Sequence, residues 1–159
     1  MDKSKEKVYK SAIGAIPKIV NNFIPKTDNQ KLFYDKISNF DNQLILCHGI
    51  AGTGKTYVSI YKALQDVLRR GLPYKKLIIV NPTVDVGNED KLGFLPGELS
   101  AKIQQYNEST FTILDKILGK EKTKKMINDG KIEIGVLNFL RGVNLENCYL
   151  ILDEAQNVS

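Results

Sequence analysis

The chain has 159 residues, 42% hydrophobic and 26% charged, which is ordinary for one globular domain with a hydrophobic core. No apolar run reaches the roughly 18 residues of a membrane span, and the charged residues 1–10 have no apolar run behind them, which argues against a secretory signal. The net charge of +5 permits nucleic-acid binding without requiring it, and we expect a cytoplasmic protein.

The first elements predicted along the chain are a helix and a buried strand. Residues 1–26 are expected to form an N-terminal extension, and residues 27–159 one domain. Thr27 or Asp28 is placed to cap a helix over residues 31–37, because both residue types accept hydrogen bonds from free N–H groups. The apolar run Leu44–His48, bounded by polar residues, predicts a buried strand of a parallel sheet.

The segment that follows this strand reads GIAGTGKT and fits G-x-x-x-x-G-K-[ST], the phosphate-binding Walker A loop, or P loop. Its glycines allow the backbone N–H groups to approach a phosphate closely. Lys55 would place its charge on the β- and γ-phosphates, and the Thr56 hydroxyl would be a ligand of Mg²⁺. The residues expected to bind the nucleotide here are Gly49, Ile50, Ala51, Gly52, Thr53, Gly54, Lys55 and Thr56.

The middle of the chain alternates predicted helices and strands, as an α/β protein does. A helix is expected over residues 57–70, where Tyr57, Tyr61, Leu64 and Leu68 form one apolar stripe. The other predicted elements are a strand at residues 77–80, a long loop over 83–97, helices over 98–118 and 120–128, and a strand at 132–136. Together they predict a three-layer α/β sandwich around a mainly parallel sheet.

The last apolar run ends in two acids, which is what a magnesium site opposite a phosphate loop requires. Tyr149–Leu152 predicts a strand, and Asp153 after it would hold Mg²⁺ while Glu154 polarises the attacking water. Cys148 at this strand and Cys47 at the first one are interpreted as reduced core residues, neither a disulfide nor a metal pair.

Two further polar features have competing interpretations. Gln30 in the first predicted helix is either a solvated side chain or a reader of adenine, because an amide can pair with N6 and N7 of that base. The lysines at 116, 120, 122, 124 and 125 form either a solvated helix face, which is the favoured interpretation, or a nucleic-acid patch.

Taken together, the motifs resemble the PhoH-like ATPases over residues 22–159. Besides GIAGTGKT, the resemblance rests on Leu92–Gly97 (LGFLPG), on Lys102, Ile103 and Tyr106, on Arg141 and Gly142, and on Asp153–Asn157 (DEAQN). It implies a RecA-like P-loop NTPase similar to the first motor domain of superfamily 1 helicases. It also implies bacterial or bacteriophage origin, ATP and Mg²⁺ as substrate and cofactor, and a nucleic-acid partner, RNA rather than DNA.

The same resemblance implies roles for single residues. Gln30 matches the family's adenine-reading glutamine, and Gln156 matches the position that couples the γ-phosphate to the nucleic-acid path. Pro82-Thr83 matches the loop that in helicases contacts the backbone of the nucleic-acid strand. The sequence departs from the pattern at Asn81, Gln105, Val143 and Asn144, which removes two cationic positions from those loops. The catalytic positions Lys55, Asp153 and Glu154 are all present.

Three functions remain open from the sequence. The first is Mg²⁺-dependent ATP hydrolysis coupled to nucleic acid. The second is phosphoryl transfer to a small acceptor, which Glu154 disfavours because a base that activates water suits hydrolysis. The third is a nucleotide-binding module without turnover.

The resemblance also implies a further strand. PhoH-like proteins continue beyond the Walker B segment (Tyr149–Glu154), and in their sheet order the next strand lies between that segment and the Walker A strand. We therefore expect two unpaired inner edges here, with Lys55 and Asp153 set apart by about 5 Å per missing neighbour. The chain alone is expected to bind nucleotide weakly, to hydrolyse it negligibly, and to self-associate unless a complementing C-terminal polypeptide is present.

Overall fold

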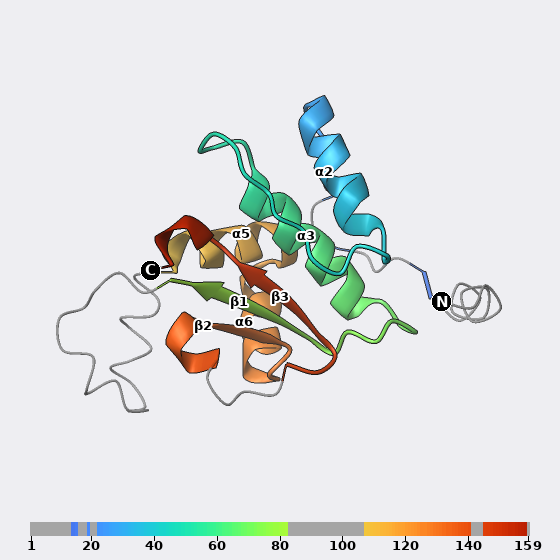
Figure 1. The fold of residues 1–159 in the computed structure, drawn as a ribbon. Helices are drawn as coiled ribbons and strands as arrows, with labels where there is room; N and C mark the ends of the chain where they lie inside the picture. Colours follow the sequence, from blue (N-terminus) through green and yellow to red (C-terminus); the bar gives the residue numbers. More distant parts are fainter. Residues whose placement is uncertain (1–13, 16–18, 20–21, 83–106, 141–144, 159) are drawn as a thin grey trace.

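The computed structural model describes residues 14–15, 19, 22–82, 107–140 and 145–158 (Figure 1). Several predicted features lie outside these residues. They are Thr83, most of the predicted loop and the first part of the predicted helix over 98–118, the LGFLPG block, Lys102, Ile103, Gln105, Tyr106, Arg141, Gly142, Val143 and Asn144.

The centre of the described structure is a parallel sheet of three strands in the order β2-β1-β3. Its strands are β1 (Lys76–Asn81), β2 (Ile132–Val136) and β3 (Cys148–Leu152). Leu77 of β1 is in register with Ile132 on one side and Tyr149 on the other. Residues 77–80 are buried and uninterrupted by polar side chains, as expected of a central parallel strand covered on both faces. The predicted α/β class is confirmed.

The described residues also form four α-helices, of which the first packs on the second and not on the sheet (Figure 1). They are α2 (Asp28–Ser38), α3 (Lys55–Leu68), α5 (Glu108–Leu118) and α6 (Lys120–Asn128). Short 3₁₀ turns, η2 (Leu137–Leu140) and η3 (Ala155–Asn157), follow β2 and β3. The Thr27 hydroxyl accepts from the Gln30 N–H at 3.2 Å, so the predicted N-cap of α2 is confirmed.

Helix α3 is the most deeply buried helix, because it packs on β1 and β3 and also contacts α2 and α5. Ile60, Ala63 and Leu64 are fully buried. The predicted stripe is confirmed at Tyr61 and Leu64, while Tyr57 and Leu68 at its ends are half-buried. The core continues through side chains of the sheet and of α5 and α6: Leu77, Ile79, Leu114, Ile117, Met126 and Ile132.

The N-terminal segment packs on this core. Ile19 is buried, and the Phe23 ring lies 5.5–6.2 Å from the rings of Tyr34, Tyr57 and Tyr61. Aromatic rings at such distances attract one another beyond the effect of area burial. The predicted domain boundary between residues 26 and 27 stays a prediction, but two side chains from before it contribute to the core.

One predicted strand is not formed. Residues 44–50 are extended but pair with no strand in the described part of the chain, and Leu44 and Leu46 are 81% and 87% exposed. The prediction of a buried strand at Leu44–His48 was therefore wrong for this structure, because a strand needs a hydrogen-bonded neighbour and none of the described residues supplies one here. For the same reason the prediction that Cys47 is buried was wrong: Cys47 is exposed and Cys148 is half-buried, both as free thiols.

Candidate functional site

The loop that leads into α3 has the conformation its glycines permit. Gly52 and Gly54 have φ angles of 77° and 86°, in the left-handed region that other residues rarely adopt. Gly54 is the N-cap of α3, and no side chain caps the helix there. The N–H groups of the first turn, and the positive end of the helix dipole, are therefore available to an anion at this loop.

Lys55, the first residue of α3, folds back over the loop. Its ammonium donates to the carbonyl oxygens of Gly49 and Ile50 at 2.8 and 2.9 Å. The Thr53 hydroxyl donates to the same Ile50 carbonyl at 2.8 Å. These bonds hold one positive charge within the curve of the loop, where a phosphate could replace the two carbonyls as its partner.

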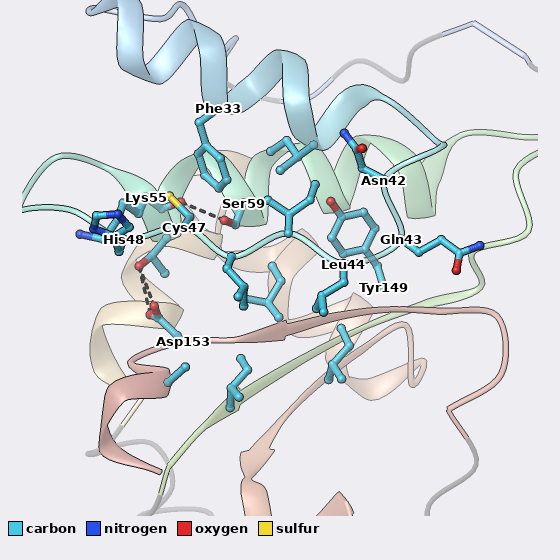
Figure 2. A pocket seen from close by; sticks show the side chains of 18 of the residues that line it. Phe33, Asn42, Gln43, Leu44, Cys47, His48, Lys55, Ser59, Tyr149 and Asp153 are labelled. Atoms are coloured by element: carbon cyan, nitrogen blue, oxygen red, sulfur yellow. Dashed lines mark hydrogen bonds between the residues drawn. The ribbon is translucent and has the colours of Figure 1, made fainter.

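Thr56 and Asp153 come together from opposite ends of the sequence. The Thr56 hydroxyl lies 3.0 Å from both carboxylate oxygens of Asp153, as the dashed lines that end on Asp153 in Figure 2 show. Asp153 follows β3, and its N–H donates to the Val80 carbonyl at 2.9 Å, which fixes the residue at the carboxyl edge of the sheet. The two expected magnesium ligands thus meet where the start of a helix and the end of a strand come together, while the expected separation of Lys55 and Asp153 stays a prediction.

Gln30 lies against the loop as well. Its side-chain amide donates to the Thr53 carbonyl at 2.9 Å, and its side-chain oxygen accepts from the Lys26 N–H at 2.8 Å. A Cβ atom at Gly54 would come within 3.3 Å of the Gln30 amide nitrogen. The Gln30 side chain would have to shift by a few tenths of an ångström to admit that atom, so the left-handed φ of Gly54 is the stronger reason for glycine at this position. Gln30 joins α2 to the loop. Its reading of adenine stays a prediction.

The other two predicted residues follow Asp153 directly. Glu154 is exposed and has a φ of 51°, a conformation that costs a non-glycine residue about 1 kcal/mol. Its carboxylate accepts a hydrogen bond from the side-chain amide of Gln156, in the turn η3. The structure thus places Glu154 and Gln156 as one polar pair beside Asp153.

A cavity of about 880 Å³ connects these residues (Figure 2). The end near the loop is lined by Lys55, Thr56 and Asp153, with Glu154 and Gln156. The cavity then runs between two walls, residues 42–49 on one side and β3 on the other. The polar end and the apolar remainder thus form one continuous space.

The sequence reasoning missed a buried ion pair, one member of which, Asp66, lines the cavity. Lys62 and Asp66, one helical turn apart on α3, form a salt bridge, and both side chains are at least 93% buried. Burial raises the pKa of Asp66, while hydrogen bonding and charge from Lys62, and the charge of Arg69, lower it. The spacing of four residues was the one available signal, and it is too common on helices to stand out.

Two tyrosines lie close to this ion pair. Tyr149 of β3 packs on Tyr74 with ring centres 5.4 Å apart. Burial raises the pKa of the Tyr149 hydroxyl well above its ordinary value, with smaller contributions from Asp66 and Tyr74. Tyr149 is therefore a neutral wall residue at physiological pH.

The polar end of the cavity carries oxygen ligands that suit Mg²⁺. Within the described residues, no group of three or more His, Cys, Asp or Glu side chains could enclose a metal ion. Mg²⁺ does not require one, since it binds through one or two carboxylates together with substrate phosphates and waters. The hydroxyl of Thr56 and the carboxylate of Asp153 are the hard oxygen ligands it prefers.

Comparison with known proteins agrees with this geometry. The family profile described as PhoH-like protein matches residues 22–159. The chain belongs to the PhoH-like protein family. The family is a P-loop family of the ATPase type, so nucleotide binding is its general property.

Individual PhoH-like relatives are similar over most of this chain. A PhoH-like protein of Bacillus subtilis is 42% identical over 118 residues, covering 74% of this chain and 36% of the relative. A PhoH-like protein of Mycobacterium leprae is 37% identical over 135 residues, covering 85% and 37%. Protein PhoH of Escherichia coli is 34% identical over 119 residues, covering 74% and 32%. The chain thus spans about a third of the length of these relatives.

The described helices also bear on a membrane location. No helix within the described residues is both long enough and apolar enough to span a bilayer.

Proposed function

We propose that this chain binds ATP with Mg²⁺ at the P loop and hydrolyses it. The observation that carries the proposal is the contact of the Thr56 hydroxyl with the Asp153 carboxylate at 3.0 Å, beside the Lys55 ammonium. A hydroxyl and a carboxylate at the start of a helix, with a cation over the loop, are the groups that Mg²⁺ and a polyphosphate require.

Each of these side chains has a distinct task in the proposal. Lys55 exchanges the carbonyls of Gly49 and Ile50 for phosphate oxygens and keeps its position over the loop. Thr56 and Asp153 hold Mg²⁺, which neutralises the charge of the phosphates when it is bound. Because phosphoryl transfer depends on positioned charge, the hydrogen bond from the Asp153 N–H to the Val80 carbonyl would contribute by fixing the position of the carboxylate.

Glu154 is the residue proposed to accept a proton from the attacking water. It follows the magnesium ligand, and its carboxylate is exposed and oriented by the Gln156 amide. A base within reach of water at this place favours hydrolysis over transfer to a small acceptor. Gln156, bonded to Glu154, is the proposed link between the γ-phosphate and a second ligand.

Nucleic acid, RNA before DNA, is the proposed second ligand. Exposed lysines on and before α6 support a basic surface: Lys116, Lys120, Lys122, Lys124 and Lys125. Such a surface attracts any polyanion, and its contribution to the binding affinity should fall as the salt concentration rises.

Gln30 is proposed to read the adenine base of the nucleotide, which would require its side-chain amide to leave the Thr53 carbonyl.

A single-turnover measurement tests hydrolysis. With the chain in excess over labelled ATP, phosphate release is followed for the wild type and for Glu154→Gln, with and without single-stranded RNA. We expect Glu154→Gln to retain Mg²⁺ and ATP binding and to release phosphate about 10²–10⁴-fold more slowly, because it keeps the shape and loses the base. Equal rates would contradict the assignment of Glu154.

The same measurement separates the alternatives. Release of phosphate from ATP only when a small acceptor is added, with the phosphoryl group found on that acceptor, would indicate a kinase. Tight binding of MgATP with no release in any condition would indicate a module without turnover.

A further inference from the structure

Helix α6 carries a lysine-rich surface that the nucleotide site does not use. Six of its nine residues are exposed, and four of these six are lysines. Lys131, which is also exposed, follows the helix just before β2 begins. We call these five side chains the α6 basic surface: Lys120, Lys122, Lys124, Lys125 and Lys131.

The α6 basic surface lies away from the P loop. Helix α6 packs on α5 and β2, whereas the cavity is bounded by β3 at the other edge of the described sheet (Figure 1). Of the residues that line this cavity, none belongs to α6. A ligand on the α6 basic surface would therefore leave the nucleotide end of the cavity uncovered.

The stability of the helix does not explain these lysines. The first turn of a helix is the positive end of its dipole, so Lys120 and Lys122 are unfavourable there. Lys120 and Lys124 are also one turn apart, where like charges repel. Within the described residues, none of the five lysines forms a salt bridge. This uncompensated charge favours an anionic ligand over a merely solvated face.

The surroundings of the lysines narrow the class of anion. The apolar side of α6 is buried in the core, where Thr123 and Met126 are at most 4% exposed. Among the described side chains between Asn107 and Leu137, no large apolar one is exposed. A helix that lies in a membrane surface needs exposed apolar residues, and a single-strand binding site needs aromatic rings on which bases stack. The α6 basic surface offers neither.

From these features we infer that the α6 basic surface binds the phosphate backbone of duplex nucleic acid without reading its sequence. Phosphate contacts position a protein on nucleic acid but carry no sequence information. A duplex suits the surface because it carries one charge per roughly 1.7 Å, so that α6, about 13 Å long, faces about eight charges. The inference rests on the proposed function only in taking nucleic acid as the second ligand, and it adds the duplex form and the place of binding.

Binding at this surface should be independent of the nucleotide. Two sites influence each other only where both ligands bias the same structural change, and the α6 basic surface and the P loop share no lining residue. We therefore expect MgATP to change the duplex affinity by no more than about twofold. A nucleic-acid contact that responds to the γ-phosphate through Gln156 would be a second one, at the carboxyl edge of the sheet.

Fluorescence anisotropy with a short labelled RNA duplex of mixed sequence gives the first result. The logarithm of the affinity should fall with the logarithm of the salt concentration with a slope of about −4, since each of the five phosphates neutralised releases about 0.9 counterion. A DNA duplex of the same sequence should bind within about threefold, because the surface reads only phosphates. The single strand should bind about tenfold more weakly, because it has the lower charge density and finds no stacking partner.

Charge reversal in the first turn of α6 separates a binding surface from a solvated face. Lys120→Glu/Lys122→Glu should weaken duplex binding by about 100-fold at low salt, since two phosphate contacts become repulsive. The same variant should unfold at a higher urea concentration than the wild type, because acids suit the first turn of a helix. The matched control is Lys31→Glu/Lys36→Glu, which reverses two exposed lysines of α2 and should keep the duplex affinity within about threefold.

Several outcomes would overturn the inference. One is a gain in stability of Lys120→Glu/Lys122→Glu with unchanged duplex affinity, as a solvated face predicts. Others are a preference for the single strand, binding to phosphatidylserine vesicles but not to the duplex, or a change of about tenfold or more in duplex affinity on addition of MgATP. Duplex binding as expected from a chain that fails to bind MgATP would support the α6 basic surface and count against the proposed nucleotide site.

Discussion

Thr56 and Asp153 lie 97 positions apart in the chain, and their contact defines the site. The sequence indicated both residues as candidate magnesium ligands, because each of them stands in a recognisable motif that follows an apolar run. It did not predict the bonds that Lys55 and Gln30 make with the loop, since these depend on how α2 packs beside α3. No local pattern encodes that packing.

The division of tasks between the two adjacent acids can be tested at this scale. Asp153→Asn keeps an oxygen for the Thr56 hydroxyl but loses the charge that attracts Mg²⁺. The gain in ATP affinity that Mg²⁺ provides should therefore fall by about tenfold, the effect of one charged interaction. Binding is measured by calorimetry with MgCl₂ and with EDTA. Glu154→Gln is the matched control and should keep the full magnesium effect. If the two variants behaved alike, the assignment of separate tasks would be wrong.

At the scale of elements, prediction succeeded where local signals decide the outcome. The strand at residues 132–136 and the helix at residues 120–128 have the predicted bounds, because alternation and helical spacing end at clear breakers. Residues 44–48 failed for a non-local reason. Their apolar run fits a buried strand, but whether it becomes one depends on a neighbour that is absent from the described residues.

Helix α3 provides a stability prediction through its buried ion pair. Lys62→Met leaves the Asp66 carboxylate buried without its partner, which should lower the free energy of unfolding at pH 7 by about 3 kcal/mol. Urea unfolding measures the loss. Lys62→Met/Asp66→Leu is the control and should recover most of it, since an apolar pair of similar size needs no charge compensation.

The pH dependence of the Lys62→Met loss has a definite sign. Burial raises the pKa of Asp66 in the folded state, and removal of Lys62 raises it further. A carboxyl whose pKa is higher in the folded than in the unfolded protein lowers the free energy of unfolding at pH values above its folded-state pKa. This destabilisation disappears as the pH falls through the folded-state pKa toward the ordinary pKa of a carboxyl. The stability deficit of Lys62→Met should therefore shrink on acidification. A deficit that grows as the pH falls would contradict this account of the pair.

At the scale of the whole molecule, one cavity joins the P loop to the space between residues 42–49 and β3. The resemblance to a known family predicted an unpaired edge on each side of a missing strand, and the described residues leave both edges unpaired. The Thr56–Asp153 contact nevertheless brings the two expected magnesium ligands together beside these unpaired edges. The carboxyl edge of the sheet, where Thr56 and Asp153 meet, is held by α3 and β1, so it is formed even where the sheet beside it is open.

Binding of MgATP to the wild-type chain, measured by isothermal titration calorimetry beside two lysine variants, tests the nucleotide site most directly. Lys55→Ala removes the charge over the loop, and Lys75→Ala removes an exposed charge just before β1, at the opposite end of the sheet. Lys55→Ala should weaken binding by about tenfold or more, the effect of one charged hydrogen bond to phosphate, and Lys75→Ala should leave it unchanged. Equal affinity of the wild type and Lys55→Ala would contradict the account.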